Sequence, residues 1–380
     1  MAKMTSRERF IVAMQRGIPD RVPCTPDISN MVPARLTGRP FWDIYYYQAP
    51  PLWRAYINAV NELGLDGWFF NGSPRFTYDI DLEHEQLAYH WSNERLVIDS
   101  RIGTPAGDLT QQVTYYIADP PTVTIKPIKD FKTDWAKLRY LMQVPTGYDA
   151  SICEIQRREL GESGAFGMAV GMPGFQGWFG LAEGTAMALT YLYYDEPDLI
   201  EELRQMDDAR QVKMMEMQLE LKPDFILIGA SGAITLQSPA LARQLSLPTL
   251  KKLSRMARQA GVLTILHSCG LEKDLVKMCA EETELDCINP LEPPPMGDCN
   301  LSEIKQLYGD RLALMGNLHT TDVMLRGTVK EVEQAAKQAI DDAGAGGGFI
   351  LSTGDQCGRD TPLENLRKLV EVCETYGRYD

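Results

Sequence analysis

The sequence predicts an α/β protein, specifically a (β/α)8 (TIM) barrel with a β-hairpin inserted between its second and third strands. Short apolar runs rich in β-branched and aromatic residues alternate with amphipathic stretches, which is typical of βαβ units around a buried parallel sheet. Eight such runs are present, and eight is the number of strands in this barrel. The expected strands are residues 22–27, 66–71, 166–172, 225–230, 262–269, 285–291, 312–317 and 349–353.

The helices between these strands are predicted from their start and stop signals. Thr328-Val-Lys-Glu331 is a capping box, apolar residues follow at helical spacing, and Gly344 is expected to end the helix. Thr361-Pro-Leu-Glu364 predicts the start of the last helix, with proline at its first position. Thr5 and Asn300, each with a glutamate three residues later, predict two more helix starts.

Residues 72–164 do not fit the repeating pattern. Within them, residues 88–99 and 111–118 alternate in polarity on either side of a turn-forming stretch, Gly103-Thr-Pro-Ala-Gly107, which predicts the inserted hairpin. We expect this insertion to form a rim or lid over the barrel mouth, and the whole chain, residues 1–380, to be one domain.

Composition excludes several classes of protein. The 52 acidic and 38 basic side chains give a net charge of −14, which argues against nucleic acid or an anionic membrane as a partner. No run of 18 apolar residues predicts a transmembrane helix. The first residues are charged and lack the apolar core of a signal peptide, so a cytoplasmic location is expected. The eight cysteines are too sparse for a disulfide scaffold and are expected to be thiols.

Two of the expected strands end in residues that bind zinc in other proteins. The fifth ends in His267-Ser-Cys269, whose two outer side chains point to the same side of an extended chain, and Cys357 follows the eighth. These ends meet at the face of a barrel that carries active sites. His267, Cys269 and Cys357 are therefore candidate ligands of a tetrahedral zinc with a fourth position open to substrate. The alternative is that the His-x-Cys pair is accidental, with one residue packed and the other solvated.

Two thiolates and an imidazole leave zinc little net positive charge, which favours binding of a soft atom for alkyl transfer over activation of water. Other strand ends offer polar side chains. Asp27, Asn71 and Asn317 are candidates for binding the cofactor, and Glu292 and His319 for catalysis. Each has a structural alternative, a cap or a loop brace. Glu292 is also a candidate fourth zinc ligand, together with Asp355, a water molecule or the substrate.

With these motifs the chain resembles the uroporphyrinogen decarboxylase superfamily, and within it the branch of zinc-containing, corrinoid-dependent methyltransferases. The motifs that carry the resemblance are Ser6-Arg-Glu-Arg-Phe10, Pro19-Asp-Arg-Val-Pro23, Gln237-Ser-Pro239, Leu266-His-Ser-Cys-Gly270, Gly309-Asp-Arg311, Met315-Gly-Asn317 and Asp360-Thr-Pro-Leu-Glu-Asn365. The resemblance runs nearly end to end and implies a (β/α)8 barrel, a zinc ion and a corrinoid carried by a partner protein.

Two departures from the family patterns matter. The decarboxylases carry arginines on the first strand for porphyrin carboxylates, whereas here that strand reads Val22-Pro-Cys-Thr-Pro-Asp27. In the methylcorrinoid:coenzyme M methyltransferases, which the chain resembles, the last cysteine directly follows a glycine. Here Gly354 is followed by Asp355, and Cys357 comes two residues later. Either the loop is shifted or Asp355 is an additional ligand.

The resemblance implies a zinc-dependent methyltransferase that exchanges a methyl group between a small molecule and a corrinoid (cobalamin) protein. Zinc would either activate a thiol acceptor that attacks methyl-cobalt, or polarise a methyl donor that cobalt(I) attacks. Two alternatives stay open: a metal-free, decarboxylase-like lyase acting on a carboxylate, and a non-enzymatic corrinoid-binding protein with a structural zinc.

Overall fold

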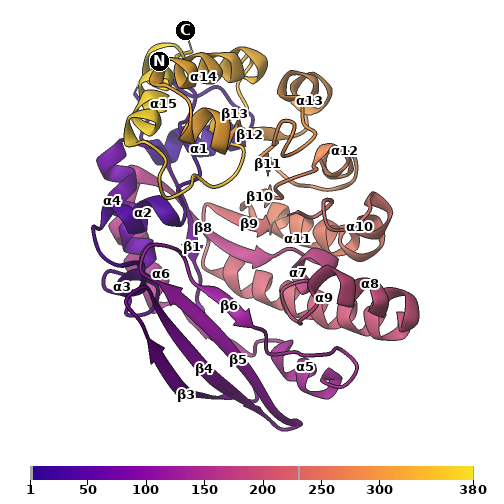
Figure 1. Cartoon of the computed structure of the whole chain (residues 1–380). Helices are drawn as coiled ribbons and strands as arrows, with labels where there is room; N and C mark the ends of the chain where they lie inside the picture. The colour runs from indigo at the N-terminus through magenta and orange to yellow at the C-terminus, as the bar shows by residue number, and fades with distance from the viewer. Residues whose placement is uncertain (1–2, 230–231, 380) are drawn as a thin grey trace.

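The computed structural model describes residues 3–229 and 232–379, and a seven-stranded parallel sheet forms its centre (Figure 1). In spatial order its strands are β1 (Gly67–Gly72), β8 (Gly164–Gly171), β9 (Phe225–Gly229), β10 (Leu263–His267), β11 (Cys287–Asn289), β12 (Ala313–Leu318) and β13 (Phe349–Thr353). All neighbouring pairs are parallel, and the strands follow one another in chain order. Seven of the eight expected strands are thus present. Ala230, the expected end of the fourth, lies outside the described residues.

The remaining expected strand, residues 22–27, is an isolated bridge instead of a regular strand. Cys24 pairs in parallel with Leu351 of β13, Thr25 N–H donates to Leu351 C=O at 2.9 Å, and Asp66 N–H donates to Cys24 C=O at 2.9 Å. Pro23 and Pro26 have no N–H, so this segment cannot continue a ladder. It still links β13 to the residue that precedes β1, at the two edges of the sheet.

Helices follow most strands and cover the outside of the sheet. They are α1 (Ser6–Met14), α2 (Met31–Leu36), α3 (Phe41–Tyr45), α4 (Leu52–Leu63), α5 (Trp135–Leu141), α6 (Ser151–Leu160), α7 (Phe175–Trp178), α8 (Thr185–Asp195), α9 (Pro197–Glu220), α10 (Pro239–Leu245), α11 (Leu247–Ala260), α12 (Lys273–Glu282), α13 (Leu301–Tyr308), α14 (Val329–Ala343) and α15 (Leu363–Thr375), with short helical turns η1 (Gly161–Ser163) and η2 (Thr320–Leu325).

The predicted helix signals are confirmed with small shifts. Thr5 and Thr328 form complete capping boxes at α1 and α14, and Asn300 caps α13. Gly344 directly follows α14. Pro362 precedes the first residue of α15, one position earlier than expected. None of the described helices combines the length and apolarity that a bilayer span requires.

The stretch between β1 and β8 forms a four-stranded antiparallel sheet below the parallel one (Figure 1). Its strands are β3 (Glu83–Trp91), β4 (Arg95–Thr104), β5 (Gly107–Tyr116) and β6 (Thr122–Ile125), and β4 and β5 pair across the turn between Thr104 and Gly107. The short strands β2 (Arg75–Thr77) and β7 (Gly147–Asp149) pair with each other. Ile102 and Leu109 of this sheet share a hydrophobic cluster with Trp135 and Trp178, so it packs against α5 and α7.

Helix α1 closes one end of the parallel sheet. Phe10, Ala13 and Met14 belong to a cluster with side chains from all seven strands of the parallel sheet, among them Phe225 and Ile350. Helix α1 therefore covers the amino ends of the strands. The carboxyl ends, where barrels of this type carry their active sites, are not covered by it. At the same end of the sheet, Arg9 donates to Asp66 Oδ1 at 2.5 Å, and Arg21 donates to Asp66 Oδ2 at 2.8 Å.

Asp66 is therefore expected to be critical for stability, because its fully buried carboxylate also accepts from Cys24 N–H at 2.8 Å. Asp66→Ala leaves the Cys24 N–H without a partner and removes a buried carboxylate from Arg21 and from Arg9, which keeps Asp20, and we expect it to lower the free energy of unfolding by about 3–5 kcal/mol in urea denaturation. Glu62→Ala, which removes an exposed partner of Arg367, is the control and should change it by less than about 1 kcal/mol. Equal effects of the two substitutions would contradict this account.

Candidate metal site at the carboxyl ends of the strands

His267 and Asn289 occupy equivalent positions at the carboxyl ends of adjacent strands. They are the last residues of β10 and β11 and are paired in register, so their side chains leave the sheet on the same side. On the other side of β10, His267 is paired with Gly229 of β9. A Cβ atom at Gly229 would lie 2.8 Å from His267 Cβ, so glycine leaves room for the imidazole.

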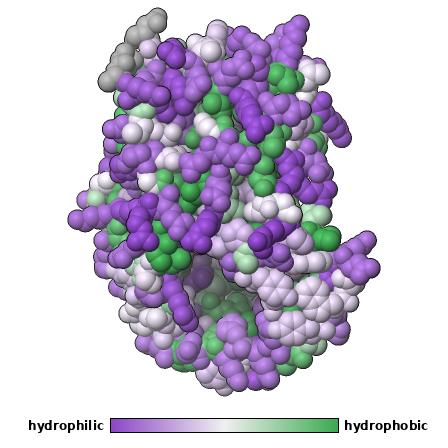
Figure 2. Space-filling view, turned by 90° about the vertical axis from the view of Figure 1, so that its left-hand side faces the viewer, coloured by the Kyte–Doolittle hydropathy of each residue, from purple (hydrophilic) through white to green (hydrophobic). Residues whose placement is uncertain are grey.

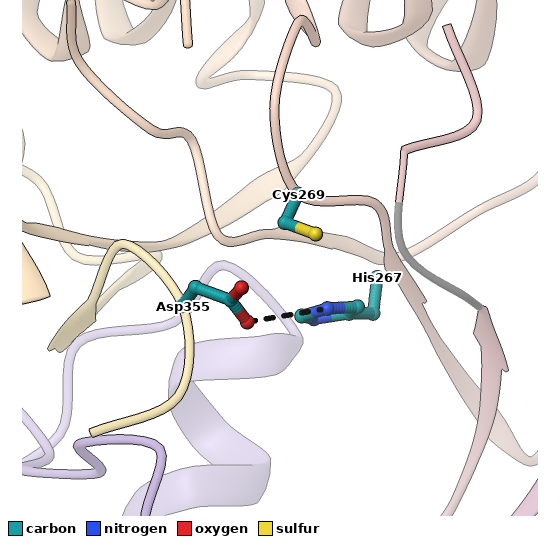
Figure 3. A group of neighbouring side chains, drawn as sticks. All are labelled: His267, Cys269 and Asp355. Carbon is teal, nitrogen blue, oxygen red and sulfur yellow. Dashed lines mark ion pairs between the residues drawn. The ribbon is translucent and has the colours of Figure 1, made fainter. Parts of the chain in front are cut away.

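The imidazole is oriented by its neighbour. His267 Nδ1 lies 3.2 Å from Asn289 Oδ1, and because an amide oxygen only accepts, Nδ1 donates. The neutral ring then carries its lone pair on Nε2, which lies 3.8 Å from Asp355 Oδ1. Figure 3 shows His267 and Asp355 pointing toward each other from opposite sides of the site.

Three side chains gather here with possible metal-ligating atoms. One such atom from each of His267, Cys269 and Asp355 lies within 4.8 Å of the others, and all three residues are partly exposed. An imidazole, a thiolate and a carboxylate are all zinc ligands in proteins, and three protein ligands with one open position are typical of catalytic zinc sites. The sequence motif placed His267 and Cys269 together. Asp355 was only an additional candidate, and its position directly after Gly354 was the available signal.

Hydrogen bonds to residues 25–29 fix the conformation of the loop that carries Asp355. Asp27 N–H donates to Thr353 Oγ1 at 3.0 Å, and the Thr353 hydroxyl donates to the Asp355 carbonyl at 2.6 Å. Cys357 N–H donates to the Asp27 carbonyl at 2.8 Å. Gln356 Nε2 donates to Ser29 Oγ at 2.8 Å. The loop is thereby folded with the Asp355 side chain toward His267.

Cys357, the expected third ligand, does not belong to the group of three. Its side chain is fully buried, and its Sγ lies 4.0 Å from Thr353 Oγ1. Burial, together with the nearby Asp27 carboxyl, raises the pKa of the Cys357 thiol to about 12. Without a metal ion this thiol is therefore neutral at physiological pH.

Glu292 contacts both loops that carry the group. Its Oε2 accepts from the N–H of Gly270, next to Cys269, and its Cγ would lie 3.3 Å from a Cβ at Gly354, next to Asp355. Burial raises the pKa of Glu292, and the Asp355 charge raises it further. Fully buried Glu272 accepts from Leu291 N–H at 2.7 Å, and burial holds its pKa well above the usual range. Glu292 therefore lies beside the ligand group.

The other expected site residues lie at or near the same strand ends in different settings. Asp27 is buried, and burial raises its pKa although the hydrogen bonds with Ser29 oppose this effect. Asn71 lies in β1, and its Nδ2 is buried with no hydrogen-bond partner among the described residues. Asn317 Nδ2 donates to the Leu291 carbonyl at 3.1 Å.

His319 acts as a cap, which was the structural alternative for it. Its Nδ1 accepts from the N–H groups of Thr321 and Asp322 at 3.2 and 3.0 Å, at the start of η2. His319 and Asn317 also line an open cavity of about 550 Å³ together with Asp298 and Asp342. A catalytic role of His319 stays a prediction.

Comparisons with known proteins bear on this site. The family model described as "Uroporphyrinogen decarboxylase (URO-D)" matches residues 86–376. A methylated-thiol–coenzyme M methyltransferase of Methanosarcina mazei is 28% identical over 156 residues, covering 40% of this chain and 39% of that protein. The methylcobamide:CoM methyltransferase MtbA of the same organism is 23% identical over 99% of both chains.

A solved structure has a similar fold over its full length. The structure described as a methyltransferase from Methanosarcina mazei superimposes with a TM-score of 0.65 at 19% identity, over 98% of this chain and 99% of the other. At this level of identity the likeness concerns the fold alone.

Differences in burial predict how the cysteines react. Cys269 alone among the eight, all within the described ranges, is not buried. In native protein stripped of metal, iodoacetamide at pH 8 should modify Cys269 first and leave Cys357 unmodified, because a pKa of about 12 leaves Cys357 almost no thiolate. Peptide mass spectrometry over time measures both rates, and urea-unfolded protein is the control in which both should react. Equal native rates would contradict the buried placement of Cys357.

Proposed function

Because the chain belongs to the uroporphyrinogen decarboxylase family, we propose that it is a zinc-dependent methyltransferase. The zinc would bind at the carboxyl ends of the strands of its parallel sheet. The reaction exchanges a methyl group between a small molecule and a corrinoid carried by a partner protein. The observation that carries the proposal is the group of His267, Cys269 and Asp355. The activities by which the two Methanosarcina relatives are named support the reaction class.

The residues present suit zinc. Asn289 accepts from His267 Nδ1 and directs Nε2 toward the group, which is the arrangement that ligating histidines usually have. Cys269 supplies a thiolate, and Asp355 a carboxylate from the facing loop. Bound there, zinc would lower the pKa of a thiol or polarise the heteroatom that carries the methyl group. Cys357 as a ligand remains the alternative taken from the family pattern, and it requires the loop after β13 to rearrange.

The chain's own residues would hold and orient the reactants. Glu292 accepts from the Gly270 N–H of the Cys269 loop and lies close to Gly354 of the Asp355 loop, so it packs between the two loops. Asp27, Asn71 and Asn317 are proposed to contact the substrate or the corrinoid. Glu292 and His319 remain the candidates for moving a proton at the reacting heteroatom.

The fold is proposed to be a single-domain (β/α)8 barrel in which residues 22–25 take the place of the eighth strand. The stretch 72–164, with its antiparallel sheet, would form part of the rim against which the corrinoid protein docks. Figure 2 shows that one face of the molecule is hollowed in its lower part, at the level of this sheet.

Metal content tests the site directly. We expect about one zinc per chain in wild type and in Cys357→Ser, and a loss of affinity of more than about 100-fold in His267→Ala and Asp355→Ala. Elemental analysis and competition with a chromophoric chelator measure both quantities, with circular dichroism as the folding control. Zinc lost in Cys357→Ser and retained in Asp355→Ala would reassign the third ligand to Cys357. A wild-type protein without affinity for zinc would overturn the proposed function.

Methyl transfer itself is observable with a free corrinoid. Methylcobalamin and a thiol should give cob(I)alamin and the methyl thioether, and cob(I)alamin with a methyl donor should give methylcobalamin. We expect the zinc-loaded protein to accelerate at least one direction, seen as a change in the corrinoid absorbance under anaerobic conditions. His267→Ala should abolish the acceleration, and exposed Glu281→Gln on α12 should not.

The hydrogen bond from His267 to Asn289 predicts a smaller effect on the same site. Asn289→Ala removes the acceptor that holds the imidazole but leaves all ligands in place, so zinc affinity should fall by about 10–100-fold. Asn289→Asp, which keeps an acceptor, should restore most of the affinity. Chelator competition measures the three proteins, and unchanged affinity in Asn289→Ala would contradict an orienting role.

A further inference from the structure

The hydroxyl of Thr353 lies where the last strand of the parallel sheet passes into the loop that carries Asp355. Thr353 is the last residue of β13, its side chain is fully buried, and it is paired with Leu318 of β12. The next residue is also tied to the sheet, because Gly354 N–H donates to the Leu318 carbonyl at 2.7 Å. The position of the hydroxyl is therefore fixed by the sheet and not by the loop.

The hydrogen-bonding capacity of this hydroxyl is fully used. A hydroxyl can donate once and accept twice. The Thr353 hydroxyl donates to the Asp355 carbonyl at 2.6 Å and accepts from Asp27 N–H at 3.0 Å. It also accepts from the Cys357 thiol, whose Sγ lies 4.0 Å from Oγ1. One buried oxygen thus contacts both candidates for the third ligand, Asp355 through its backbone and Cys357 through its side chain.

The two contacts have opposite consequences for a metal. The bond to the Asp355 carbonyl spans the bend at residues 354–355, and the Asp355 side chain points toward His267, with 3.8 Å between Oδ1 and Nε2 (Figure 3). The Cys357 thiol is held in the hydrophobic core, and Cys357 N–H donates to the Asp27 carbonyl at 2.8 Å. The carboxylate is therefore directed toward the metal site, and the thiol is kept away from it.

We propose that Thr353 is a positioning residue whose hydroxyl selects the third metal ligand, Asp355 in place of Cys357. This inference rests on the proposed function, since it takes His267 and Cys269 as the other two protein ligands. Because a carboxylate is a harder ligand than a thiolate, the same hydroxyl would determine how strong a Lewis acid the bound metal is.

Loss of the hydroxyl should release the loop. The buried N–H of Asp27 would lose its acceptor, and the Asp355 carbonyl would lose its attachment to the end of β13. A buried hydrogen bond shifts a local opening equilibrium by about fivefold, and an unpaired buried N–H adds to that shift. The Cys357 thiol should then leave the core more often and, when zinc is present, compete with the Asp355 carboxylate for it.

Substitutions at two buried threonines test the inference. Thr353→Val keeps the shape of the side chain and removes the hydroxyl, whereas Thr353→Ser keeps the hydroxyl. Thr361→Val is the matched control, because Thr361 is also fully buried but its Oγ1 has no hydrogen-bond partner among the residues that the structure describes. Circular dichroism checks folding. If Thr353→Val does not fold, Thr353→Ala, which leaves space for a water molecule beside Asp27 N–H, replaces it with the same expected results.

The first measurement needs no metal. In protein stripped of metal and treated with iodoacetamide at pH 8, Cys357 should react at least about fivefold faster in Thr353→Val than in wild type, Thr353→Ser or Thr361→Val. The second measurement uses cobalt(II), whose sulfur-to-metal absorption grows with the number of bound thiolates. We expect about twice the wild-type absorption per cobalt in Thr353→Val, and the wild-type value in the other two variants.

Wild-type reactivity of Cys357 in Thr353→Val, or faster reaction without a second thiolate on cobalt, would overturn the inference and leave the proposed function intact. A Thr353→Ser variant that behaves like Thr353→Val would overturn it as well, because the methyl group and not the hydroxyl would then be decisive. Two thiolates bound in wild type would also overturn it. Failure of wild-type protein to bind either cobalt(II) or zinc would overturn the proposed function together with the inference that rests on it.

Discussion

The attachment of residues 22–29 to β13 and to the loop after it is the constraint on which the rest of the site depends. The same short segment joins the two edges of the parallel sheet and fixes the loop that carries Asp355. Its prolines prevent a regular strand but leave the carbonyls of Thr25 and Asp27 free to accept from Ser352 and Cys357. At the other end, buried Asp66 ties the segment to Arg9 and Arg21. Stability of the fold and position of a candidate ligand are therefore coupled.

The identity of the third ligand determines what chemistry the site favours. A carboxylate is a harder ligand than a thiolate, so a site of His267, Cys269 and Asp355 is a stronger Lewis acid than one with two thiolates. Such a site is suited to polarising a methyl donor, whereas the two-thiolate site is suited to holding a thiolate nucleophile. In the proposed mechanism the favoured direction of methyl transfer would thus depend on the conformation of the loop that carries Asp355 and Cys357.

Much of this arrangement could be predicted from the sequence, and the part that could not depends on tertiary hydrogen bonds. Alternation along a strand predicts that His267 and Cys269 emerge together, and apolar runs predict seven of the strands found. The loop 354–357 could turn a different side chain toward His267. Its conformation depends on contacts with Asp27 and Ser29, which lie more than 300 positions earlier in the chain. No local pattern records those contacts. The orienting role of Asn289 was missed for the same reason, because it requires the register of β10 against β11.

X-ray absorption spectroscopy at the zinc edge, on wild-type protein in thiol-free buffer, tests the central claim most directly. The account predicts one sulfur scatterer at about 2.3 Å and the remaining ligands as nitrogen or oxygen at about 2.0–2.2 Å. Two sulfur scatterers would show that Cys357 binds the metal, and would contradict both the assignment of Asp355 and the inferred Lewis-acid character of the site.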